Sequence, residues 1–126
     1  MTLDLSRYPQ HETVTDPDTN LTFVAGVTSL NFRSGAIGEE QQTVASPAID
    51  LFVIIPPEER EAFAARTGRR VPEDGVFHLG TEMPETFGFG MTQAFGYLQE
   101  DGFTAAENTK VRIRDFATNA FRTQIT

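Results

Sequence analysis

The sequence predicts a mainly β fold, an antiparallel sandwich or small barrel of about seven or eight strands with one short helix near 56–68. Short runs of β-branched and aromatic residues are separated by turn clusters throughout the chain. The segment PETFGFGMTQAFGY, residues 84–97, alternates bulky and small side chains, as a strand does. The 11 Phe among 126 residues supply enough apolar surface for the core of a single domain.

Residues 11–32 predict a β-hairpin. The runs HETVT and LTFVAGVTSLNF flank the turn cluster DPDTN. The longer run has apolar residues on both faces, so we expect this strand to be covered on both sides for part of its length. One face holds Leu21, Phe23, Ala25 and Val27, and the other holds Val24, Leu30 and Phe32.

A long polar loop is expected near 34–47, where the sequence reads SGAIGEEQQTVASP. It is the best candidate for a segment that reaches a partner. The run AIDLFVII, residues 48–55, then predicts a buried strand that ends at Pro56 and Pro57.

The prolines open the predicted helix over 56–68. Glutamates fill its first turn, Arg66 lies near its end, and Gly68 stops it. VFHLG at 76–80 predicts a short strand. Two closing strands are expected in TKVRIRDF and NAFRTQIT, residues 109–116 and 119–126.

The segment 84–97 has a second interpretation, a helix with Phe87, Met91, Phe95 and Leu98 on one face. Its glycines favour the strand, because each would cost a helix about 1 kcal/mol relative to alanine. The glycines are not spaced as G-x-G-x-x-G, since Gln93 stands at the third position. The aromatics lack the basic residue of an RNA-binding strand. We therefore expect no cofactor.

Charge and composition narrow the function classes. The formal net charge of −8 argues against a nucleic-acid partner, and the absence of Cys excludes thiolate chemistry. No apolar run approaches a membrane span, and the N-terminus lacks a secretory signal pattern, so we expect a cytoplasmic protein or one incorporated into a particle assembled there. In TDPDTN, the carboxylates Asp16 and Asp18 suit a turn better than a calcium loop.

His78 is the candidate for acid–base chemistry, with Asp74, Glu82 and Glu85 as the nearby carboxylates. No complete catalytic pattern or metal-ligand set surrounds it, so the sequence favours a protein that is not an enzyme. The charged residues that could instead contact a partner are Arg66, Arg69, Arg70, Glu39, Glu40, Arg112 and Arg114.

Three functions are compatible with this pattern. The first is a non-enzymatic assembly protein, a homo-oligomer or a structural subunit of a larger symmetric complex such as a viral particle component. The second is a small-molecule-binding barrel or enzyme that uses His78 with a nearby carboxylate. The third is an acidic inhibitor that mimics nucleic acid, which requires the acids of residues 1–63 to gather on one face.

Overall fold

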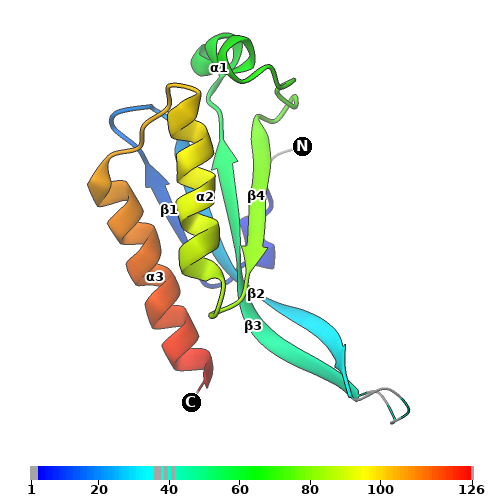
Figure 1. Ribbon diagram of the computed structural model, residues 1–126. Helices are drawn as coiled ribbons and strands as arrows, with labels where there is room; N and C mark the ends of the chain where they lie inside the picture. The colour runs from blue at the N-terminus through cyan, green and yellow to red at the C-terminus, as the bar shows by residue number, and fades with distance from the viewer. Residues whose placement is uncertain (1–2, 36–37, 39, 41, 126) are drawn as a thin grey trace.

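Four strands form one open antiparallel sheet in the order β1-β2-β3-β4, and helices α2 and α3 cover one of its faces (Figure 1). This computed structural model describes residues 3–35, 38, 40 and 42–125. The strands are β1 (His11–Thr15), β2 (Thr22–Ser34), β3 (Gln42–Ile54) and β4 (Val76–Glu82). The helices are η1 (Leu5–Arg7), η2 (Pro57–Glu59), α1 (Arg60–Thr67), α2 (Phe87–Glu100) and α3 (Glu107–Ile125).

The prediction of a seven- or eight-stranded sandwich or barrel is wrong. The described part of the chain has 4 strands and 3 α-helices, with 39% of its residues helical and 31% in strands. In the segments that alternate like strands, residues 87–97 and 109–125 are helical instead. The sheet consequently stays open and is closed on one side by a helical layer.

The segment 84–97 is helical because one of its faces is buried along the whole length of α2. Phe87, Met91, Phe95 and Leu98 are the buried residues of this helix. A strand would place Phe89 and Tyr97 on the same face as Phe87, but their side chains are 70% and 59% exposed. Burying each of these four side chains contributes about 1.5–3 kcal/mol. Their sum outweighs the cost of about 1 kcal/mol for each of the three glycines in the helix.

The two predicted closing strands are a single helix, α3. Alternation of Val111 and Ile113 with basic residues imitates a strand over a short window. Across the full segment the buried positions recur at helical spacing, namely Thr109, Ile113, Ala117, Ala120 and Phe121. The apolar stripe packs against β1, β2 and β3, and this packing favours the helix.

The first hairpin, the buried strand before the prolines and the short helix are confirmed. β1 pairs with β2 around a turn in which Asn20 has φ 63°, and α1 ends at Gly68 with φ 69°. The expected loop over 34–47 is shorter than predicted, because residues 42–47 belong to β3. Positions 36, 37, 39 and 41 lie outside the described residues.

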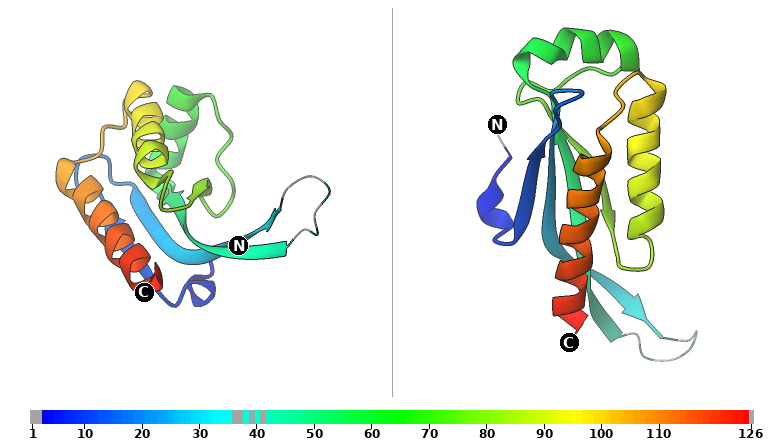
Figure 2. Two further views of the ribbon diagram at one scale, coloured as in Figure 1. Left: turned by 60° about the horizontal axis from the view of Figure 1, so that its bottom comes forward. Right: turned by 90° about the vertical axis from the view of Figure 1, so that its left-hand side faces the viewer.

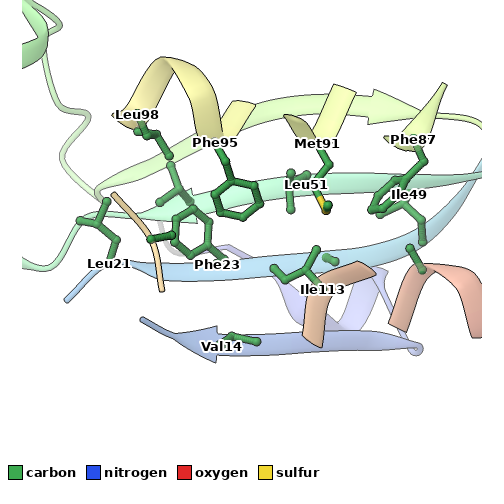
Figure 3. Close-up of a cluster of buried hydrophobic side chains, with 14 of the residues drawn as sticks. Val14, Leu21, Phe23, Ile49, Leu51, Phe87, Met91, Phe95, Leu98 and Ile113 are labelled. Carbon is green, nitrogen blue, oxygen red and sulfur yellow. The ribbon is translucent and has the colours of Figure 1, made fainter. Parts of the chain in front are cut away.

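The hydrophobic core lies between the sheet and the two long helices (Figure 3). Phe23 of β2 meets Phe95 of α2 with ring centroids 5.0 Å apart, and Ile113 of α3 is fully buried. The N-terminal segment lies across the opposite face of the sheet (Figure 2), where the Tyr8 ring rests on Gly26. The part of β2 within the body is therefore covered on both sides, as predicted for part of its length. Among the described helices none has the length and apolar character to cross a bilayer.

Candidate functional site

A polar cluster lies on the face of the sheet opposite the long helices, around the carboxylate of Asp50. His78 Nε2 is 3.2 Å from Asp50 Oδ1, and the Tyr8 hydroxyl donates a 2.6 Å hydrogen bond to Asp50 Oδ2. Thr81 also donates its hydroxyl to Asp50 Oδ1. Four polar side chains, from the segment after η1, from β3 and from β4, thus meet at one point.

An irregularity in the pairing of β3 with β4 makes this cluster possible. Asp50 pairs with Thr81 and Leu51 with Gly80, whereas Phe52 pairs with His78, so Leu79 is an extra residue on β4. In a regular strand, side chains three residues apart point to opposite faces. The bulge restores His78 and Thr81 to the same face, beside Asp50.

The hydrogen bonds define the tautomer of the neutral imidazole. An ionised Asp50 only accepts hydrogen bonds, so His78 Nε2 carries the proton and shares it between Asp50 and Thr81 Oγ1, the latter also 3.2 Å away. In the neutral ring, Nδ1 is then an acceptor, on a side chain that is 48% exposed. Burial, together with the hydrogen bond to Asp50, raises the pKa of Tyr8 to about 12, so Tyr8 remains a donor at neutral pH.

The carboxylates that the sequence suggested for His78 lie elsewhere. Glu82 extends on the helical side of the sheet, where its carboxylate lies against Gly90 of α2. Glu85 is exposed in the turn before α2, and Asp74 accepts a hydrogen bond from the backbone N–H of Val76. The carboxylate that does meet the imidazole, Asp50, was missed. A signal was present, because Asp50 is a charged residue within the apolar run AIDLFVII.

The distal part of the β2–β3 hairpin is a second candidate site. β1 pairs with β2 only over 22–26, and β4 pairs with β3 only over 49–54. Residues 28–34 and 42–48 pair only with each other, and from the Ser29–Pro47 pair outward they project beyond the sheet as a two-stranded ribbon (Figure 1), which we call the arm. Its exposed described side chains include Val44, which is 37% exposed.

The other edge of the sheet carries a groove. β4 is the last strand in the described sheet, and although α2 contacts this strand, its residues Phe77 and Leu79 are only half-buried. A cavity of about 230 Å³ lies beside them, between β4, α1 and α2. Its lining includes Phe63, Arg69, Tyr97 and Asp101.

The structure separates the predicted contact residues. Arg69 lines the groove, and the guanidinium of Arg66 lies 5.4 Å from the ring centre of Phe103. Arg112 forms a 2.7 Å ion pair with Glu12. Glu40 is exposed at the arm end, whereas Glu39 lies outside the described residues. The remaining two, Arg70 and Arg114, are exposed on the body.

The acids of the first half of the chain point in different directions. Glu12 pairs with α3 and Asp16 is buried, while Asp50 lies on the opposite face of the sheet and Glu58 accepts a hydrogen bond from Asn20. These four acids of the described chain therefore do not share one face.

Within the described ranges, no group of three or more His, Cys, Asp or Glu side chains is arranged to hold a metal ion. Comparison of the chain with protein-family models, curated proteins and solved structures gives no match. The arm, the groove and the Asp50 cluster are therefore the features from which we infer a function.

Proposed function

We propose that this protein is a non-enzymatic assembly module whose copies associate through the β2–β3 arm. The observation that carries the proposal is the projection of residues 28–34 and 42–48 beyond every other strand and helix of the body (Figures 1 and 2). Both outer edges of the arm lack a strand partner within the described chain.

The physics of a two-stranded ribbon supports an intermolecular role. An isolated hairpin is marginally stable in water, and exposed strand edges are normally blunted by charge, proline or a covering segment. The paired residues of this arm contain a single charge, Arg33, and Pro47 stands only at its base. Such an edge is suited to pairing with another chain.

Removal of the arm tests the proposal. Ser29 pairs with Pro47, so residues 30–46 can be replaced by an Asn-Gly turn without altering the body. We expect light scattering to give a mass above the 13.9 kDa protomer for the wild type and a protomer mass for the variant. The control is Phe89→Ser, an exposed change on α2. A monomeric wild type, or a variant that stays associated, would contradict the proposal; circular dichroism establishes that both variants fold.

The Asp50–His78 pair supports a second candidate, acid–base chemistry at the outer face. The 3.2 Å contact orients an imidazole whose Nδ1 is free to accept a proton. Hydrolysis of p-nitrophenyl acetate tests it, with His78→Gln as the variant and exposed His11→Gln as the control. A rate lost only in His78→Gln supports this candidate, and equal rates in both variants exclude it.

A further inference from the structure

We infer that the groove beside β4 receives the arm of a second copy of this chain, with residues 42–46 added to the sheet as a strand next to β4. The inference rests on the proposed function and identifies the surface to which the arm binds. It follows from the unpaired edge of β4, the apolar side chains within the groove lining, and the opposite charges of Glu40 and Arg69.

The edge of β4 supplies the backbone partners. β4 runs over 7 residues, and no other strand of the described chain lies on its outer side. An extended segment that pairs with such an edge gains main-chain hydrogen bonds, and its alternate side chains occupy adjacent pockets. Residues 42–46 precede Pro47, the only residue of this part of the arm without a backbone N–H, so the pairing segment is free of proline.

The cavity supplies the side-chain pocket. Its lining combines polar residues with the apolar side chains of Val53, Phe77 and Leu79, and it includes the exposed ring of Tyr97. Val44 and Tyr97 are two of the three large apolar side chains exposed in the described structure. Insertion of Val44 beside Tyr97 would remove both from water.

Charge favours the arm of a second copy as the occupant. Residues 42–48 carry no charge, so they enter the groove without bringing an unpaired ion into it. Glu40 is exposed just before this segment, and Arg69, which lines the groove, has no ion-pair partner among the described side chains. A Glu40–Arg69 pair would form between copies whose net charge of −8 otherwise repels them.

Disulfide cross-linking tests the contact, because the natural sequence has no Cys. Val44→Cys chains are mixed with Tyr97→Cys chains under oxidised glutathione, and mass spectrometry identifies the linked peptides. The matched control replaces Tyr97→Cys with Thr118→Cys, at an exposed position on α3. We expect the yield of the 44–97 disulfide to be well above that of the control. Adding Arg69→Glu to the Tyr97→Cys chain should lower this yield roughly fivefold. Adding Glu40→Arg to the Val44→Cys chain as well should restore it.

The outcomes separate this inference from the proposed function. If removal of the arm dissociates the assembly but the yield of the 44–97 disulfide stays at the control level, the inference is wrong and the proposed assembly function stands. Links found only between two Val44→Cys chains would likewise overturn it, because the arms would then pair with each other. A monomeric wild type without links would contradict both.

Discussion

The carboxylate of Asp16 accepts a 2.6 Å hydrogen bond from the hydroxyl of Thr109, 93 residues later in the chain. The same oxygen accepts the backbone N–H of Ala106, and the other oxygen accepts the N–H and the hydroxyl of Thr19. One fully buried side chain therefore orders the β1–β2 turn and fixes the start of α3 against it. It is a structural residue, as the turn interpretation of TDPDTN predicted.

Asp16→Asn should destabilise the fold by about 1–3 kcal/mol, because the amide nitrogen cannot accept the hydrogen bonds that one carboxylate oxygen now receives. Urea unfolding followed by circular dichroism measures the change. Asp18→Asn is the matched control in the same turn. Asp18 is exposed, so its free energy of unfolding should change by less than about 0.5 kcal/mol. Equal effects of the two substitutions would refute the structural role of Asp16.

Acid should weaken the fold through the same residue. Burial by itself raises the pKa of Asp16, but the hydrogen bonds from Thr109, Thr19 and Ala106 more than offset it and hold the pKa below 3.8. The unfolded state thus binds the proton more tightly than the folded state does. The contribution of the Asp16 carboxylate to the free energy of unfolding is therefore complete above pH 3.8, and it is lost as pH falls through the lower pKa of the folded state. Unfolding curves at decreasing pH should show the wild type converging on Asp16→Asn. A constant difference down to strongly acid pH would contradict this linkage.

The phenol of Tyr8 should titrate at about pH 12, because burial and the hydrogen bond to Asp50 both disfavour the phenolate. In Tyr97→Phe the absorbance of tyrosinate reports Tyr8 alone, since the chain has 2 Tyr. Adding Asp50→Asn should move the midpoint towards the ordinary value of 10.0. The contribution of the protonated Tyr8 phenol to the free energy of unfolding is complete below pH 10, and it is lost as pH rises through about 12. An unchanged midpoint in Asp50→Asn would show that the hydrogen bond has no effect on the pKa.

Two glycine substitutions should change stability in opposite directions. Gly88→Ala adds a methyl group to α2 where nothing lies within 4 Å, so it should stabilise the protein by about 0.5–1 kcal/mol. Gly26→Ala places a Cβ 2.5 Å from the Tyr8 ring and should destabilise it by about 1–3 kcal/mol. Thermal melts compare the two variants. A neutral Gly26→Ala would mean that Tyr8 does not rest on the sheet.

The sequence by itself determined those features that depend on local chemistry. The turn cluster and the alternating runs gave the first hairpin. The prolines followed by acidic residues gave the helix that ends at Gly68, where a left-handed conformation suits glycine. The apolar run after residue 48 gave the central strand β3, although its beginning at Gln42 was not visible in the polar sequence.

Tertiary structure decided the rest, because the competing local patterns differ little in energy until a face is buried. Met91 and Phe95 are core residues only when α2 lies on β2 and β3, and Asp16 anchors α3 only when the two segments meet. The sequence singled out His78, but the carboxylate beside it belongs to Asp50 of another strand, and no spacing along the chain reveals the bulge that brings the two together. Long-range packing, and not local propensity, made PETFGFGMTQAFGY a helix with one buried face.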